Sequence, residues 1–314
     1  MPQKRYRKKK SERHTLKAKL TYSIIATIFI ILCFALYSFS HPIGPNQNFS
    51  TSIPEASLPK AAIIDQLSIL ARNQTFVQQA TTILENASFT VDYHKGEDVT
   101  VEFYRRLPQQ GYSLIVMRVH SGIEYSGNQT TGNVDLFTSE PYDEDEAATT
   151  YFWDAIDDRL VRVFFTEGGP MYFGISPKFV ESSMNGRFNN TTIIMMGCDG
   201  LRPGYTTMAE AFVKRGAKVY IGWTGPVTST HSDRATICLL QSLIIENQTI
   251  KNAIISALNE VGSDPAFHTE LLFYPVEQED YTVQINKNKN FSHYTLASYV
   301  ELSSPRRKKE EEYP

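Results

Sequence analysis

The stretch LIVMRVHSG at residues 114–122 decides the fold, together with its later counterpart IIMMGCDG at residues 193–200. Each is an apolar run that ends in a side chain suited to catalysis and passes quickly into glycine. Short apolar runs are typical of buried strands in a parallel sheet, in which neighbouring strands lie ~4.8 Å apart. If these two runs are neighbouring strands, His120 and Cys198 leave the same edge of the sheet about 5 Å apart, as a cysteine–histidine dyad.

Further apolar runs of strand length alternate with segments of helical periodicity along the chain. Such alternation over short connections is typical of right-handed crossover units and a parallel sheet. The alternation pauses at about 123–190, where two runs that flank EGGP at residues 167–170 predict a hairpin insertion. The predicted strands are 61–64, 89–93, 114–119, 191–196, 217–222 and 270–276, and the predicted helices are 76–84, 99–107, 207–215 and 230–245.

The length of the chain, 314 residues, is enough for one large α/β domain with a substantial core. We therefore expect an α/β domain over residues 60–300, with a mostly parallel sheet and helices on both faces, in three layers. Residues 301–314 carry a run of mixed charge, which predicts a disordered tail.

The amino-terminal segment has the pattern of a membrane anchor. Residues 1–20 carry nine lysines and arginines against one glutamate, and residues 21–40 carry no charge. About twenty apolar residues in a helix span the ~30 Å hydrocarbon core, and the positive-inside rule places the basic side in the cytoplasm. We expect a basic cytoplasmic tail, a single-pass transmembrane signal-anchor, a proline-rich stalk over 41–59 and an extracellular domain. The alternative is a signal peptide cleaved near residues 38–40.

The same features indicate which partners to expect. Because the basic residues lie beside the predicted span, the lipid bilayer is their expected partner, and nucleic acid is not. The chain contains neither GxGxxG nor GxxxxGK[ST], and its histidines and cysteines lack metal-ligand spacing, so we expect neither a cofactor nor a metal.

Glycosylation acceptors and cysteine usage agree with an extracellular glycoprotein. With Cys33 inside the predicted span, only Cys198 and Cys238 remain, which is too few for a disulfide scaffold. A bridge between these two cysteines is the alternative, and it would abolish the nucleophile. The Asn-x-Ser/Thr acceptors are Asn48, Asn73, Asn86, Asn128, Asn189, Asn190, Asn247 and Asn290.

The residue types at the two strand ends suit nucleophilic catalysis. A thiol attacks carbonyl groups only as the thiolate, so Cys198 needs a base within reach. His120 suits that role, since an imidazole titrates near neutral pH. Gly122 and Gly200 leave the backbone close to the reacting atoms, so the amide groups of Gly122 and Cys198 are candidates for holding an oxyanion. Cys238, in an apolar helical segment, is typical of a core residue.

The two motifs resemble those of the caspase-like, or clan CD, cysteine peptidases. In that family one apolar strand ends in His-Gly and a later strand ends in the nucleophilic cysteine. The resemblance implies a caspase-like fold with His120 as the general base, Cys198 as the nucleophile and the amide of Gly122 in the oxyanion hole. The sequence departs from the family pattern at Ser121, which separates the histidine from the glycine.

Substrate preference depends on side chains expected near the same edge. Asp65 follows the first strand and Asp199 follows the nucleophile, so an acidic pocket would favour lysine or arginine before the scissile bond, with Trp223 as an apolar wall. Arg118, inside an apolar strand, needs a partner because an unpaired buried charge is costly. A structural ion pair and the binding of a substrate carboxylate are both open. His231 is an alternative base, although its position also suits a helix cap.

Together these features predict a membrane-anchored, extracytoplasmic cysteine endopeptidase, or a related acyl-transfer hydrolase, that acts on a peptide or protein. The competing prediction is a catalytically inactive, caspase-like surface glycoprotein that serves as a binding or scaffold module. A third is an open-sheet receptor for a small molecule, in which Cys198 would lie buried in an apolar cleft.

Overall fold

The computed structural model describes residues 58–284. The predicted basic tail, the membrane span and nearly all of the predicted stalk lie outside the described residues. So do the predicted charged tail and the acceptors Asn48 and Asn290. Among residues 58–284, no helix combines the length and the apolar character needed to cross a membrane.

Within residues 58–284 the strands form two sheets, a main sheet of six strands and a second sheet of four. The strand order in the main sheet is β10-β9-β8-β3-β1-β2, and β10 alone is antiparallel to its neighbour. Strands β3 and β8 are buried at every residue, which explains their continuous apolar runs. The strands are β1 (Lys60–Asp65), β2 (Thr90–Lys95), β3 (Leu114–Met117), β8 (Thr191–Met195), β9 (Ala217–Trp223) and β10 (Leu271–Tyr274).

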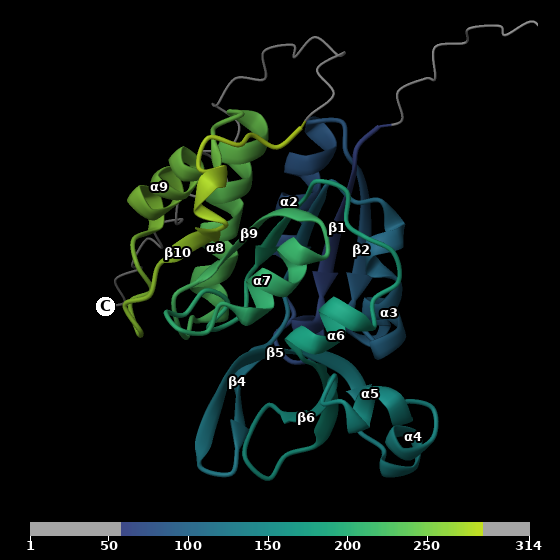
Figure 1. Cartoon of the computed structure of the whole chain (residues 1–314). Helices are drawn as coiled ribbons and strands as arrows, with labels where there is room; N and C mark the ends of the chain where they lie inside the picture. The colour runs from purple at the N-terminus through teal and green to yellow at the C-terminus, as the bar shows by residue number, and fades with distance from the viewer. Residues whose placement is uncertain (1–57, 285–314) are drawn as a thin grey trace, which may run out of the picture. The chain divides into compact units, whose positions relative to one another are not determined.

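Helices cover both faces of the main sheet (Figure 1), which confirms the predicted α/β architecture. Because side chains alternate along a strand, Ile63 and Ile194 pack on one face with α2, α8 and α9. Ile64 and Met195 pack on the other face with α3, α6 and α7. The helices are α2 (Gln74–Asn86), α3 (Val101–Arg106), α6 (Pro177–Ser182), α7 (Thr207–Lys214), α8 (Ser229–Leu240) and α9 (Ile250–Val261), and the short turns are η1 (Gln66–Ile69), η2 (Gly96–Asp98), η3 (Leu107–Gln110), η4 (Gln241–Ile245) and η5 (Val276–Gln278).

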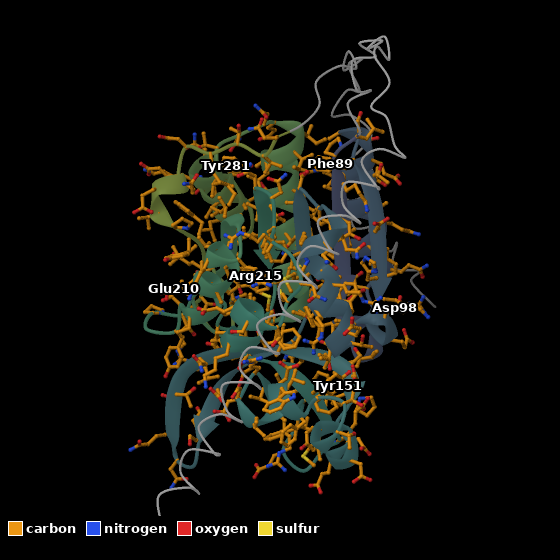
Figure 2. The ribbon with its side chains drawn as sticks, turned by 45° about the vertical axis from the view of Figure 1, so that its right-hand side comes forward. Phe89, Asp98, Tyr151, Glu210, Arg215 and Tyr281 are labelled. Atoms are coloured by element: carbon orange, nitrogen blue, oxygen red, sulfur yellow. The ribbon has the colours of Figure 1, made fainter. Side chains whose placement is uncertain are left out.

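The second sheet follows directly on β3, at the carboxyl edge of the main sheet (Figure 1). Its order is β4-β5-β7-β6, with antiparallel neighbours throughout. Strands β6 and β7 form the expected hairpin, whereas β4 and β5 form a longer one that the sequence pattern did not predict. Figure 2 shows Tyr151 at the second-sheet end and Phe89, just before β2, at the opposite end. The elements are β4 (Ser121–Ser126), β5 (Gln129–Pro141), α4 (Glu144–Ala148), α5 (Phe152–Ile156), β6 (Leu160–Phe164) and β7 (Met171–Ile175).

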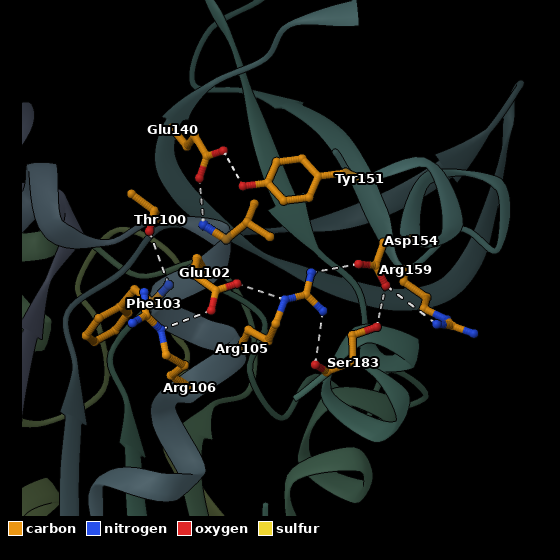
Figure 3. Close-up of polar contacts among 11 residues, drawn as sticks. Thr100, Glu102, Phe103, Arg105, Arg106, Glu140, Tyr151, Asp154, Arg159 and Ser183 are labelled. Atoms are coloured by element: carbon orange, nitrogen blue, oxygen red, sulfur yellow. Dashed lines mark hydrogen bonds and ion pairs between the residues drawn. The ribbon is translucent and has the colours of Figure 1, made fainter. Parts of the chain in front are cut away.

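Polar contacts tie the second sheet to α3 and α6 (Figure 3). Arg105 on α3 forms an ion pair of 2.7 Å with Asp154 on α5 and donates to the carbonyl oxygen of Ser183 at 3.1 Å. The hydroxyl group of Ser183 donates in turn to Asp154. Glu140 on β5 accepts a hydrogen bond from the backbone at the start of α3 and another from the hydroxyl group of Tyr151, both at 2.8 Å. These contacts hold the insertion in place beside the carboxyl edge of the main sheet.

Candidate active site

Neighbouring parallel strands deliver His120 and Cys198 to the same edge of the main sheet. Strands β3 and β8 pair in a register that aligns Met117 with Met195, and the N–H group of Met196 donates to the carbonyl oxygen of Met117 at 2.9 Å. The pairing ends there, three residues before His120 and three before Cys198, so both residues follow strand ends at the same edge of the sheet. The carboxyl edge of an open parallel sheet is where ligand sites form.

The segments that carry the two residues are in contact through Ser121 and Gly197. The hydroxyl group of Ser121, which is 3% exposed, donates a hydrogen bond of 2.6 Å to the carbonyl oxygen of Cys198. A Cβ atom at Gly197 would lie 2.4 Å from the carbonyl oxygen of Val119 and 2.5 Å from the hydroxyl oxygen of Ser121. Carbon and oxygen atoms do not approach so closely, so this contact between segments requires glycine at position 197.

The peptide bond that follows Cys198 is held at both ends. The hydroxyl group of Ser121 donates to the carbonyl oxygen of Cys198. The N–H group of Asp199, at the other end of this peptide bond, donates to the carbonyl oxygen of Gly225 at 2.9 Å. Asp199 has a φ of 60°, an uncommon value for a residue with a side chain. The thiol of Cys198 points to the carbonyl oxygen of Val227 at 3.8 Å. Within residues 58–284 the N–H group of Cys198 makes no hydrogen bond to a backbone carbonyl oxygen.

The imidazole of His120 lies among aromatic rings. Its ring stacks on Phe165 with centroids 5.4 Å apart and meets Phe137 edge-on at 4.8 Å. Burial lowers the pKa of His120 and raises the pKa of the Cys198 thiol, so both groups are uncharged at neutral pH. In the described part of the chain, no hydrogen bond joins the imidazole to the thiol.

The pairing of β4 with β5 decides which backbone amides of β4 are left unpaired at the edge of the second sheet. The N–H group of Phe137 donates to the carbonyl oxygen of His120 at 2.9 Å, so these residues form a hydrogen-bonded pair. Hydrogen-bonded and non-hydrogen-bonded pairs alternate along an antiparallel ladder. The amide of Gly122, two residues on, therefore points at its partner Asp135, whereas the amide of Ser121 points away from β5. Since β4 is an edge strand, the Ser121 amide faces outward from the second sheet.

Arg118 has carboxylate partners on two sides. Its role in the structure is therefore the structural ion pair and not the binding of a substrate carboxylate. It pairs with Asp65 at 2.8 Å and with Asp233 on α8 at 2.7 Å. Its third nitrogen donates to the carbonyl oxygen of Ala71 at 2.9 Å. The sequence pattern did not identify Asp233 as a partner of Arg118. The only signal for this network is the arginine within an apolar strand.

The three residues expected to line an acidic substrate pocket are buried. Asp65 is fully buried, and its second oxygen accepts from the hydroxyl group of Tyr93 at 3.1 Å. Trp223 is also fully buried and donates from its indole nitrogen to Ser232 at 3.0 Å. Asp199 pairs with Arg202 at 3.2 Å. All three carry out structural contacts, and this arrangement gives no support to the predicted pocket.

The structure supports neither the alternative base nor the alternative disulfide. His231 lies in the first turn of α8, where its Nε2 atom lies 3.2 Å from the carbonyl oxygen of Gly262. A carbonyl oxygen can only accept, so that nitrogen carries the proton and is not free to act as a base. Cys198 and Cys238, the two cysteines of the described range, are free thiols, so the predicted alternative of a bridge between them is wrong.

The glycosylation acceptors of the described range differ in accessibility. The side chain of Asn73 is engaged in hydrogen bonds. Its amide nitrogen donates to Asp233 at 2.8 Å, and its oxygen caps α2 by accepting from the N–H group of Phe76. Asn247 is partly buried. The exposed acceptors are Asn86, Asn128, Asn189 and Asn190.

Comparisons with known proteins identify one similar solved structure and no matching family. No family model matches the chain, and no curated protein does. Among solved structures, the chain is similar to the Arg-specific cysteine proteinase gingipain R, at 13% identity and a TM-score of 0.41. The similarity covers 73% of this chain, which spans 48% of that structure. A TM-score of this size supports no transfer of fold or activity to this chain.

Proposed function

We propose that this chain is a cysteine peptidase, or a related acyl-transfer hydrolase, with His120 as the general base and Cys198 as the nucleophile. One observation carries the proposal: two neighbouring parallel strands end three residues before His120 and Cys198, and the hydrogen bond from Ser121 keeps the segments that follow them in contact. The resemblance of both motifs to caspase-like peptidases points to the same chemistry. The proposed substrate is a peptide or protein, and no cofactor is required.

In the first half of the proposed reaction the enzyme is acylated. The imidazole of His120 takes the thiol proton of Cys198, and the thiolate attacks the carbonyl carbon, so that a carbon–sulfur bond forms and the oxygen becomes an oxyanion. The imidazolium then gives its proton to the leaving amine as the carbon–nitrogen bond breaks. The lowered pKa of His120 suits this step, because the ring is in its basic form at neutral pH. The step requires the ring to turn from Phe165 toward the thiol.

In the second half a water molecule takes the place of the amine. His120 removes a proton from the water, whose oxygen attacks the thioester carbon. The carbon–sulfur bond breaks, the carboxylic acid leaves and the thiol regains its proton from the imidazolium.

The oxyanion needs donors that are not engaged elsewhere. Within residues 58–284 the amide of Cys198 makes no hydrogen bond to a backbone carbonyl oxygen, and the amide of Ser121 points away from β5. We therefore assign the amides of Cys198 and Ser121 as the donors of the oxyanion hole. The amide of Gly122, the donor expected from the sequence, faces Asp135 and is not part of this assignment. In this assignment the serine between histidine and glycine supplies the donor that the family pattern would place on the glycine.

The proposal includes a membrane anchor over residues 21–40, with the enzyme domain outside the cell. Support comes from the uncharged run and the basic residues before it. Protease treatment of sealed, right-side-out vesicles tests this. An amino-terminal epitope on the cytoplasmic side lies inside such vesicles, so it resists added protease until the vesicles are opened. Recovery of a mature chain that begins after residue 40 would instead establish a cleaved signal peptide.

A second candidate function is a non-catalytic binding module with the same fold. The observation that favours it is the position of the His120 ring, which stacks on Phe165 and is not hydrogen-bonded to the thiol. In such a module both residues would serve only to pack the edge of the sheet.

Labelling of the full chain with a peptide acyloxymethyl ketone separates the two functions. The enzyme forms one covalent adduct per chain at Cys198, located by mass spectrometry, and the rate of labelling falls sharply in His120→Ala. Cys238→Ala serves as the matched control and labels normally. A folded wild-type chain that stays unlabelled would establish the binding module.

A further inference from the structure

Asp135, on β5, is a buried carboxyl group without a partner. Asp135 is 3% exposed, and its buried Oδ1 atom has no hydrogen-bond partner within residues 58–284. Burial of a polar group without a hydrogen bond costs several kilocalories per mole, so such a group calls for an explanation.

The carboxyl group lies on the same face of the second sheet as His120. Asp135 and Phe137 are two residues apart on β5 and therefore share a face, and the ring of Phe137 contacts His120 at 4.8 Å. Directly across from Asp135 on β4 is Gly122. Asp135 is thus the diagonal neighbour of His120 across the strand pair, a separation that long side chains can bridge.

The position opposite Asp135 carries no side chain and has room for one. A Cβ atom at Gly122 would meet only the ring of Phe137, at 3.7 and 3.9 Å, which is ordinary van der Waals contact. Beside the unpartnered carboxyl group there is therefore space for at least a methyl group.

Charge at this position favours a cation as the missing partner. Burial, and after it the nearby charge of Glu124, raises the pKa of Asp135 to about 8. Within residues 58–284 no lysine or arginine forms an ion pair with Asp135 or Glu124. The described chain also offers no group of three acidic, histidine or cysteine side chains that could hold a metal ion. An organic cation satisfies the carboxylate and can also lie against the ring of Phe137.

We infer that Asp135 and the open position at Gly122 form a subsite beside His120 that binds a cationic side chain of the substrate, an ammonium or a guanidinium group. The inference rests on the proposed function, since it assigns the cation to the substrate of that enzyme. It differs from the sequence-based expectation, in which Asp65 and Asp199 supplied the acidic groups.

Binding of peptides to the full chain carrying Cys198→Ala tests the inference without cleavage. The probes are fluorescent, end-blocked alanine hexapeptides in which one lysine, or its uncharged analogue norleucine, moves through all positions. At one position we expect lysine to bind about tenfold more tightly than norleucine, as for a charge-assisted hydrogen bond in a buried setting. In Asp135→Asn this ratio falls to about one, and Gly122→Ala lowers it by filling the space.

Asp157→Asn is the matched control, because it removes an exposed carboxylate from the same insertion. The lysine preference persists in this variant. The absence of a lysine preference at every position, or its survival in Asp135→Asn, overturns the subsite. The binding assay needs no nucleophile, so its outcome is independent of the ketone labelling. If lysine is preferred but the wild-type chain is not labelled, the proposed enzymatic function is rejected and the cation site is retained.

Discussion

The hydroxyl group of Ser121 donates to the carbonyl oxygen of Cys198 at 2.6 Å, and so the residue after the proposed base holds the backbone of the proposed nucleophile. The opposite end of the same peptide bond is held by Gly225, from the segment after β9. The conformation of Asp199, with its positive φ, is therefore determined from two neighbouring strand ends. This clamp fixes the position of Cys198 relative to the end of β3.

Loss of the clamp should slow the reaction more than it weakens substrate binding. In Ser121→Ala we expect kcat to fall about tenfold, because small errors in the position of reacting groups are costly, while KM changes little. The free energy of unfolding should fall by about 1 kcal/mol. Ser176→Ala is the matched control, since the buried Ser176 also donates to a backbone carbonyl, that of Asp158 at 2.8 Å. Equal kinetics in the two variants would show that Ser121 has no positioning role.

Gly197 should tolerate no side chain. In Gly197→Ala the new methyl group would overlap the carbonyl oxygen of Val119, which belongs to backbone and cannot rotate away. We expect a loss of about 2–3 kcal/mol in urea unfolding. Gly122→Ala, whose methyl group would lie 3.7 Å from the nearest atom, should unfold at nearly the wild-type urea concentration. A stable, fully active Gly197→Ala protein would contradict the close contact of the two segments.

The lowered pKa of His120 predicts the acidic limb of the pH–rate profile. The neutral imidazole is the active base, and burial favours the neutral form, so activity is retained as the pH falls through the ordinary titration range of histidine. The acidic limb of kcat/KM should therefore lie below pH ~6.5. Phe165→Ala removes a ring that buries the imidazole and should move the limb to higher pH. A limb above the ordinary range in the wild type would contradict this environment.

Asp135 should make the stability of the protein fall as the pH rises. Its pKa is about 8 in the folded chain and about 3.9 in the unfolded chain, so the folded state holds an extra proton between these values. The contribution to stability is complete below the unfolded value and declines by about 1.4 kcal/mol per pH unit up to the folded value. Asp135→Asn cannot ionise and should be the more stable protein at pH 8, with the difference shrinking toward pH 5. Urea unfolding across this range measures it, with Asp157→Asn as the variant that should follow the wild type.

Removal of Arg118 should destabilise the carboxyl edge of the main sheet. Arg118→Leu leaves Asp65 and Asp233 buried without their cation, which costs about 3–5 kcal/mol. Burial already raises the pKa of Asp65, and its protonation relieves part of the cost, so this variant should lose less stability at acidic pH than at neutral pH. Addition of Asp65→Leu and Asp233→Asn should restore much of the stability at neutral pH. A single variant as stable as the wild type would show that the network contributes little.

The strands of the main sheet could be predicted from sequence because burial on both faces demands continuous apolar runs. The runs at 114–119 and 191–196 do form adjacent parallel strands, and their neighbours follow the predicted alternation. The hairpin of β4 and β5 escaped prediction because glycine, polar residues and a register shift at Ile123 and Tyr125 obscure the two-residue period.

The sequence by itself determined the strands of the main sheet, four of the helices on its faces and the edge at which His120 and Cys198 emerge, since these depend on apolar periodicity along short stretches. Only the tertiary structure decided the partners of Arg118, the bridging role of Ser121 and the isolation of Asp135. Each of these depends on where a polar side chain meets a segment distant in the sequence, as Arg118 meets Asp233. A buried polar group must find such a partner, but its own sequence neighbourhood does not say which one, because only the folded chain brings the candidates together.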